Sequence, residues 1–248
     1  MDKNTEILFL EKVKKRIEYM DKSDESFQLI SELLGLIEEK NKTLDDLKEE
    51  MKELDESSKR DALTGLYNRK AEQSYFKEEF KDLNDPSKEE ADTYYVIAID
   101  LDHFKSINDT YGHDVGDDAL IIVARGLEST FRRYDLVVRE GGDEFVIIAK
   151  NCPPSILEDR LKNMSISITN TIHNALDSHR RIVDGEEVSI ERPHDYTISY
   201  GYSELDLSGL NNDLLEDRDA FMEWFKEQKK AADSASFNMK EEHHAVRR

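Results

Sequence analysis

The segment DLVVREGGDEFVIIAK, residues 135–150, constrains the fold of this 248-residue chain more than any other stretch. Two apolar runs, LVV and FVIIA, flank two adjacent glycines followed by two adjacent acids. Apolar runs of strand length on both sides of a glycine turn predict an antiparallel hairpin within a sheet. Like charges at the tip of a hairpin repel one another. The acids are therefore either solvated turn residues or neighbours of a cation.

Helices and strands alternate on both sides of this hairpin from Arg60 onward. Capping residues and apolar periodicity predict helices at residues 61–83, 114–132, 154–178 and 219–243. Further strands are predicted at residues 94–100, 181–190 and 196–205. This order predicts an α+β fold, a ferredoxin-like split βαββαβ core with extra elements. We expect the strands before and after the first helix of this core to lie side by side.

The first sixty residues have a different texture, with no proline and one glycine, Gly35. Their apolar residues recur at heptad spacing, at Ile30, Leu33, Ile37, Leu44, Leu47, Met51 and Leu54. Such a seam over about four heptads predicts a dimeric coiled coil. The alternative is one amphipathic helix packed on its own domain. A shorter helix precedes the seam, and DKSDES at 21–26 is the expected break. We therefore expect a helical segment, residues 1–59, and a second domain, residues 60–248.

The charge of the chain narrows the choice of partners. The sequence has 56 acidic and 35 basic residues, a formal net charge of −21. Such a surface disfavours nucleic acid polymers and anionic membranes, although a small anionic substrate remains compatible if metal ions offset its charge. The single cysteine, Cys152, excludes an internal disulfide, and we expect neither a membrane span nor a secretory signal. These features favour a cytoplasmic protein.

Acidic residues lie at the ends of the central apolar strands. Asp100 ends the strand YYVIAID, and Asp102 lies two residues further on, hence on the same face of an extended chain. With adjacent strands, Asp100 and Asp143 would face one another at one edge of the sheet. Oxygen ligands from two strands predict a magnesium site, and glycines at the turn let phosphates approach the backbone. Considered alone, Asp100 or Asp102 could instead cap the following helix.

Several motifs accompany the hairpin. The chain contains DALTGLYNR at 61–69, DLDHFKSINDTYGHDVGDDAL at 100–120, GGDEF at 141–145 and TISYGY at 197–202. In this order they resemble the GGDEF-domain diguanylate cyclases, whose domain is palm-like, over about residues 60–240. The resemblance implies a nucleotidyltransferase that condenses two GTP into cyclic di-GMP and releases pyrophosphate. Because each domain binds one GTP, it also implies a homodimer, which the N-terminal helices would pair.

The resemblance assigns roles to residues by position. It implies that Asp100, Asp143 and the main-chain carbonyl of Leu101 hold Mg²⁺, for which Mn²⁺ can substitute. Glu144 would assist at the metal or activate the 3′-hydroxyl, so the implied catalytic residues are Asp100, Asp143 and Glu144. The implied GTP-binding residues are His103, Phe104, Lys105, Asn108, Asp117, Gly142 and Lys240. Asp117 suits guanine, which offers two adjacent donors where adenine offers no matching pair.

Two further regions bear on regulation and activity. Arg132 and Asp135 match the family's RxxD inhibitory site for the product cyclic di-GMP; the alternative is an exposed ion pair. At the C-terminus, His243 and His244 replace an expected Gly-Arg, so a phosphate-binding arginine is missing unless Arg247 or Arg248 replaces it. Two alternatives therefore stay open. The chain could be a catalytically weak GGDEF module that signals by binding GTP or cyclic di-GMP, or a cyclase that joins other nucleotides.

Overall fold

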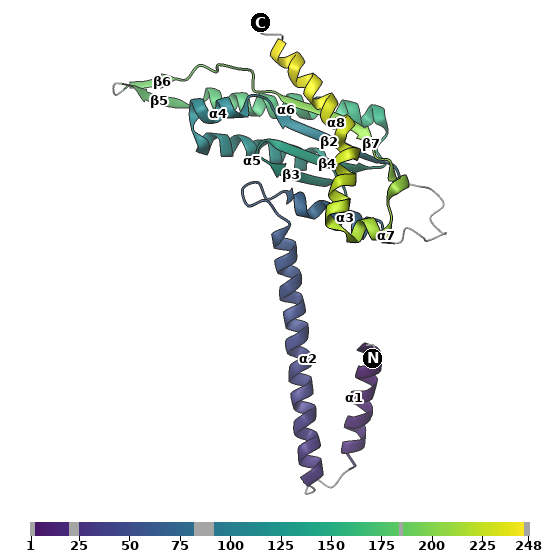
Figure 1. Cartoon of the computed structure of the whole chain (residues 1–248). Helices are drawn as coiled ribbons and strands as arrows, with labels where there is room; N and C mark the ends of the chain where they lie inside the picture. Colours follow the sequence, from purple (N-terminus) through teal and green to yellow (C-terminus); the bar gives the residue numbers. More distant parts are fainter. Residues whose placement is uncertain (1–2, 20–24, 82–91, 184–185, 246–248) are drawn as a thin grey trace. The chain divides into compact units, whose positions relative to one another are not determined.

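The computed structural model describes residues 3–19, 25–81, 92–183 and 186–245. The chain divides into two compact units, Met1–Ser58 and Lys59–Arg248. The first unit consists of two helices, α1 (Lys3–Ile17) and α2 (Glu25–Ser58), drawn in purple and blue in Figure 1. Most of the expected break between them, residues 20–24, lies outside the described residues.

Helix α2 presents its apolar seam to solvent. None of its residues is buried, and the side chains of Leu44 and Met51 are 53% and 70% exposed. One ion pair, between Lys14 and Glu38, joins α1 to α2. A stripe of exposed leucine and methionine side chains along a long helix is typical of a surface that another helix covers. The coiled-coil dimer stays a prediction.

The second unit is built on a five-stranded sheet, and the predicted ferredoxin-like α+β class is confirmed. Its strand order is β1-β3-β4-β2-β7. The strands are β1 (Tyr67–Asn68), β2 (Tyr94–Leu101), β3 (Leu136–Gly141), β4 (Glu144–Lys150) and β7 (Ile198–Glu204). Every pairing is antiparallel except that of the short β1 with β3. Without β1 the order is that of a split βαββαβ core.

One prediction about this sheet is wrong. The strands before and after the first helices of the core, β2 and β3, are not neighbours, because β4 lies between them. The tight turn after β3 returns the chain antiparallel to β3, and β4 then fills the place beside β2. The acids of the hairpin therefore reach Asp100 through β4, which pairs with β2, and not through β3.

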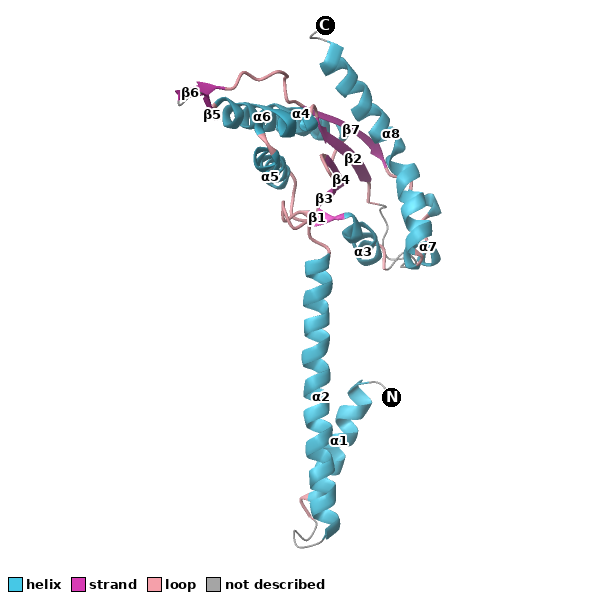
Figure 2. Cartoon of the chain, turned by 60° about the vertical axis from the view of Figure 1, so that its left-hand side comes forward, coloured by secondary structure: helices cyan, strands magenta, loops and turns pink. Residues whose placement is uncertain are grey.

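Helices cover both faces of the sheet, as Figures 1 and 2 show. One face packs on α4 (Phe104–Tyr111), α5 (His113–Thr130) and α6 (Pro154–Asp177). The other packs on α3 (Arg69–Glu79), α7 (Asn212–Glu216) and α8 (Arg218–Ala245). Strand β2 is buried on both sides, since Ile97 and Ile99 point to the first core and Val96 and Ala98 to the second.

Helix α8 approaches the sheet closely at a glycine of β7. A Cβ atom on Gly201 would lie 2.2 Å from the carbonyl oxygen of Ala232 and 2.5 Å from the amide nitrogen of Ser236. Only glycine leaves room for the helix backbone there. This contact holds the middle of α8 against β7, the edge strand of the sheet that pairs with β2.

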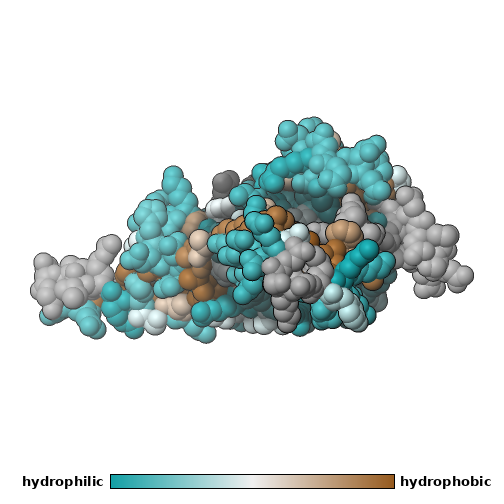
Figure 3. Space-filling view, turned by 90° about the horizontal axis from the view of Figure 1, so that it is seen from below, coloured by the Kyte–Doolittle hydropathy of each residue, from teal (hydrophilic) through white to brown (hydrophobic). Residues whose placement is uncertain are grey.

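The segment predicted as one strand at residues 181–190 forms a separate hairpin, β5 (Arg180–Val183) and β6 (Glu186–Ser189). Hydrophilic residues cover most of the described surface in Figure 3, in keeping with the 37% of charged residues in the sequence. Among the helices of the described residues, none has both the length and the apolar character that a membrane crossing requires.

Candidate active site

The sheet register brings the predicted acids together. Asp100, next to the end of β2, lies opposite Glu144, the first residue of β4. Gly142 and Asp143 form the turn between β3 and β4, and Gly142 adopts a φ of 52°, in the left-handed region that glycine enters without strain. Burial and the neighbouring charge of Asp100 raise the pKa of Asp143. Two carboxylates that repel in this way form a site that attracts a cation.

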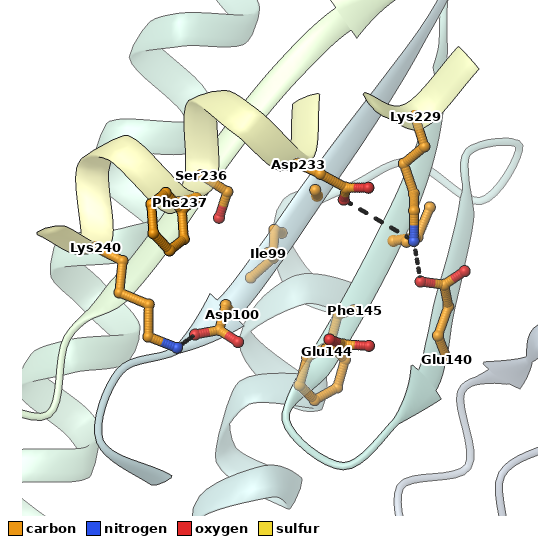
Figure 4. Close-up of a pocket in the computed structure, with 12 residues that line it drawn as sticks. Ile99, Asp100, Glu140, Glu144, Phe145, Lys229, Asp233, Ser236, Phe237 and Lys240 are labelled. Carbon is orange, nitrogen blue, oxygen red and sulfur yellow. Dashed lines mark hydrogen bonds and ion pairs between the residues drawn. The ribbon is translucent and has the colours of Figure 1, made fainter. Parts of the chain in front are cut away.

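A cavity of about 410 Å³ opens between these strands and α8. We call it the acidic cavity, because Asp100, Glu140, Glu144 and Asp233 line it together with Lys229 and Lys240. Figure 4 shows two pairs at its opposite ends, Lys240 with Asp100 and Lys229 with Glu140, and Glu144 between them. Predicted residues thus share the cavity with further charged residues, among them Glu140 and Lys229, to which the motifs assigned no role.

Lys240 donates a hydrogen bond to Asp100 Oδ2. Burial by itself lowers the pKa of Lys240, but the hydrogen bond and the charges of Asp100, Asp102 and Asp143 raise it above the ordinary value. The lysine is therefore firmly cationic at the end of β2. A cation at this point can neutralise either the carboxylate or a phosphate group that approaches it.

Arg139 supports the turn, a role that the sequence did not indicate. Its Nε and Nη2 atoms donate to the carbonyl oxygen of Gly142 at 3.0 and 2.8 Å. Its Nη1 atom donates to Asp61 Oδ1 at 2.9 Å, and Thr64 donates to the same oxygen. The arginine thereby ties the turn that carries Asp143 to the DALTG segment, 78 residues earlier in the chain.

The side chain of Asp102 is held by hydrogen bonds within the protein. It is fully buried and accepts hydrogen bonds from Ser199 Oγ at 2.9 and 2.8 Å and from Thr197 Oγ1. These contacts join the end of β2 to β7. The next residue, His103, is the N-cap of α4.

The loop predicted to hold the triphosphate lies at the start of α4. His103 has a φ of 62°, and its ring stacks on that of His194 with centroids 4.1 Å apart and planes within 5°. The helix begins at Phe104, so the amides of Phe104 and Lys105 belong to its first turn, where N–H groups point away from the helix. Lys105 is exposed beside them.

The two residues predicted to read guanine lie on neighbouring helices. Asn108 on α4 leans over Gly116 of α5, where a Cβ atom would lie 1.9 Å from its Oδ1. Asp117 follows Gly116 and is exposed. The glycine therefore allows the amide of Asn108 to lie next to the carboxylate-bearing turn of α5.

Comparisons with known proteins agree with this geometry. Residues 58–232 match the family described as "Diguanylate cyclase, GGDEF domain". The chain belongs to the GGDEF-domain family. It is 40% identical over 107 residues to "Probable diguanylate cyclase DgcC" of Escherichia coli, which covers 43% of this chain and 28% of that protein. The aligned segment is thus little more than a quarter of the relative's length.

Two solved structures share the fold. Diguanylate cyclase SiaD of Pseudomonas aeruginosa, in complex with its activator SiaC, aligns over 96% of this chain and 83% of that chain, with a TM-score of 0.50 and 24% identity. The coiled coil and GGDEF domain of DgcB from Caulobacter crescentus, in complex with c-di-GMP, aligns over 79% and 94%, with a TM-score of 0.53 and 22% identity.

The RxxD residues of this GGDEF domain lie at a second cavity of about 410 Å³. We call it the arginine cavity, since Arg60, Arg132 and Arg133 line it. Asp135 accepts hydrogen bonds from the main-chain N–H groups of Arg132 at 2.9 Å and Lys150 at 3.2 Å. Its carboxylate is therefore fixed by the backbone, while the Arg132 guanidinium contacts Tyr134.

The donor set of the GGDEF site suits Mg²⁺. Asp100 and Asp143 supply carboxylate oxygens, the ligands that this ion prefers. In the described part of the chain, three or more His, Cys, Asp or Glu side chains do not gather as a complete metal cage. Magnesium commonly binds through one or two carboxylates and takes further ligands from substrate phosphates and water, so the two acids fit it.

The two histidines that replace the expected Gly-Arg lie in the last turn of α8. The helix continues through His243 and His244, but the side chains of residues 241–245 lie outside the description, as do residues 246–248. Lys240 is the last residue of α8 whose contacts are described, and it points into the acidic cavity (Figure 4).

Proposed function

We propose that this protein is a diguanylate cyclase that condenses two GTP molecules into cyclic di-GMP with release of pyrophosphate. The observation that carries the proposal is the meeting of Asp100, Asp143 and Glu144 at one end of the sheet, with Lys240 beside them. Adjacent carboxylates and one firmly held cation form the arrangement that metal-assisted phosphoryl transfer requires.

In this proposal each side chain has a distinct task. Asp100 and Asp143, with the Leu101 carbonyl, hold Mg²⁺, and Glu144 assists at the metal or accepts the proton of the attacking 3′-hydroxyl. The bound metal supplies charge stabilisation for the α-phosphate and lowers the pKa of the hydroxyl. Lys240 exchanges its contact with Asp100 for a phosphate oxygen when substrate and metal arrive. This exchange leaves Asp100 free to bind the cation.

The substrate is placed by groups on both sides of the end of β2. The amides at the start of α4, with Lys105 and the open turn at Gly142, receive the triphosphate. A Cβ atom on Gly142 would meet nothing within 4 Å, so the backbone of the turn is open to a ligand. The carboxylate of Asp117 accepts from the N1–H and 2-amino groups of guanine, and the amide of Asn108 also contacts the guanine edge. Asp117 therefore makes guanine the preferred base.

Synthesis needs two domains, because one domain binds one GTP. The exposed seam of α2 favours a parallel coiled coil as the device that pairs them. Pairing through α2 raises the effective concentration of one half-site near the other. In the same proposal, cyclic di-GMP binds at Arg132 and Asp135 and restrains the enzyme.

The decisive experiment is an assay of the purified chain with GTP and MgCl₂, followed by chromatography with mass detection. Cyclic di-GMP and pyrophosphate in a 1:2 ratio support the proposal, and omission of the metal should stop their formation. Bound GTP or cyclic di-GMP without turnover would contradict it and indicate a GGDEF module that only binds nucleotide. In a parallel reaction that also contains ATP, formation of a mixed dinucleotide would contradict the assignment of Asp117.

A further inference from the structure

The end of the acidic cavity farther from Lys240 contains a cluster of buried charges. Lys229 of α8 pairs with Glu140 at the base of the hairpin turn, and their side chains are only 15% and 8% exposed. Lys229 also lies 3.9 Å from Asp233, one helical turn further along α8. Ion pairs at the surface contribute little, but a pair as buried as this one fixes the two elements that carry it.

A third member, Glu72 of α3, lies behind this pair. Its side chain is fully buried, and neither of its carboxylate oxygens has a hydrogen-bond donor among the described residues. The charge of Glu140 acts on the Glu72 carboxyl group. Burial and a neighbouring carboxylate both favour a carboxyl group that holds a proton.

The surrounding charges indicate which group holds it. Burial and the charge of Glu140 raise the pKa of Glu72 well above its ordinary value, although Lys229 and Arg69 act in the opposite direction. Glu140 has the direct contact with the lysine, so the proton belongs on Glu72. Glu72 is then an uncharged neighbour of the Lys229–Glu140 ion pair.

The position of Glu140 connects this cluster to the chemistry. It immediately precedes Gly141, and the register between β3 and β4 shifts between Arg139 and Gly141, so Glu140 is the irregular residue of the hairpin. A bulged residue is not held by the ladder of main-chain hydrogen bonds. The direction of the turn that follows, with Asp143 at its tip, therefore depends on the side-chain contacts of Glu140 and Arg139.

We propose that Lys229 is a positioning residue, which through Glu140 and the buried carboxyl group of Glu72 holds the catalytic hairpin in place against α8. The lysine does not touch the reacting atoms. Because α8 also carries Lys240, the cluster sets the distance between the hairpin acids and the phosphate-binding lysine. The link to catalysis rests on the proposed cyclase function, whereas the positioning of the hairpin does not.

The positioning is tested directly by amide hydrogen exchange of the full chain without ligands. The Lys229→Met variant should exchange the amides of residues 139–147 at least about tenfold faster than the parent, since it leaves buried acids uncompensated. The Lys230→Met variant is the matched control, because Lys230 is exposed on the same helix and pairs only at its surface. Unchanged exchange of the hairpin in Lys229→Met would overturn the proposal.

A double variant distinguishes positioning from direct contact with substrate. Lys229→Met alone should lower kcat for cyclic di-GMP synthesis about tenfold or more and change KM for GTP little. Glu140→Gln combined with Lys229→Met removes both charges and should recover most of the lost rate and the slow exchange. A double variant that regains slow exchange but not the rate would assign Lys229 to the substrate, and one impaired in both readouts would overturn the role of Glu140. If the parent protein makes no cyclic di-GMP, the proposed cyclase function is refuted. The amide-exchange comparison still tests whether Lys229 positions the hairpin.

A proton on Glu72 should change how the stability of the folded chain depends on pH. In the folded chain Glu72 faces Arg69 on its own helix, Glu140 on β3 and Lys229 on α8. Its raised pKa means that the folded state loses stability as the pH rises above the ordinary value of 4.5. Glu72→Gln should therefore unfold at the same temperature as the parent near pH 4.5 and at a higher temperature at pH 8. If Glu72→Gln and the parent unfold at the same temperature at pH 4.5 and also at pH 8, Glu72 holds no proton. It would then not belong to the cluster.

Discussion

The acidic cavity and the arginine cavity have the same volume, about 410 Å³, but opposite linings. Acids with two lysines line the first, and three arginines with Asp135 and Glu128 line the second. Strand β3 connects them, because Asp135 precedes its first residue and the turn with Asp143 follows its last. Six residues of strand separate the two by about 20 Å.

The difference teaches how one hairpin can serve two kinds of ligand. In the proposed function, the carboxylates at its tip bind a metal ion, and the charge of that ion allows an anionic substrate to bind. At its open end, guanidinium groups can take an anion without a metal. Because Asp135 also accepts from the N–H group of Lys150, both strands of the hairpin end at the arginine cavity. A ligand bound there would contact the same hairpin that carries the proposed catalytic acids.

The largest effect is expected at the tip. Asp143→Asn should reduce cyclic di-GMP synthesis by about 10³-fold or more, because the metal loses a charged ligand. Folding should not suffer. The pKa of Asp143 is raised in the folded chain, so its ionised form destabilises the fold above pH 3.8 and the amide removes that penalty. Product measurements and thermal unfolding at pH 7 without metal check both statements; substantial turnover would refute the metal assignment.

The acidic cavity is only half of the proposed site, so separating the two half-sites should have the next largest effect. Leu44→Lys with Leu47→Lys places charges in the α2 seam and should lower specific activity at micromolar concentrations by about 10²-fold. Asp46→Lys, a charge change outside the seam, is the control. Light scattering should show monomers for the seam variant alone. A monomer with full activity would contradict pairing through α2.

A substitution in the arginine cavity should weaken inhibition by the product and leave synthesis itself intact. Arg132→Ala removes a guanidinium group and should raise the cyclic di-GMP concentration for half-inhibition by about tenfold, while the initial rate stays unchanged. Arg125→Ala, an exposed arginine on α5, serves as the control. Inhibition curves that coincide for Arg132→Ala and the parent would exclude a product site at this cavity.

The smallest effect concerns the link that supports the turn. Burial by itself raises the pKa of Asp61, but its hydrogen bonds with Thr64 and Arg139 lower the pKa below its ordinary value. The stabilisation is therefore present above pH 3.8 and disappears as the pH falls through the folded-state pKa. Asp61→Asn should lose about 1–2 kcal/mol of unfolding free energy at pH 7 and less near pH 3. Denaturant unfolding at both pH values measures this, and a loss independent of pH would contradict it.

The local sequence was sufficient for the longer elements around the hairpin and for the carboxylates of the proposed site. Apolar periodicity predicted α5, α6 and α8 within a few residues, and the glycine turn predicted the β3–β4 hairpin. Each of these patterns repeats within one element, at the period of a helix or a strand. The acids Asp100, Asp143 and Glu144 were found because motifs keep them at the ends of such elements.

The tertiary structure alone decided which elements are neighbours. It placed β4 rather than β3 beside β2, and it brought together residues far apart in sequence, such as Arg139 with Asp61 and Lys229 with Glu140. A single charged residue such as Glu72 is indistinguishable in the sequence from a solvated one, because its burial depends on elements that pack over it. The sequence determined which carboxylates lie at the hairpin tip, and the packing of α3 and α8 decided which buried charges lie beside it.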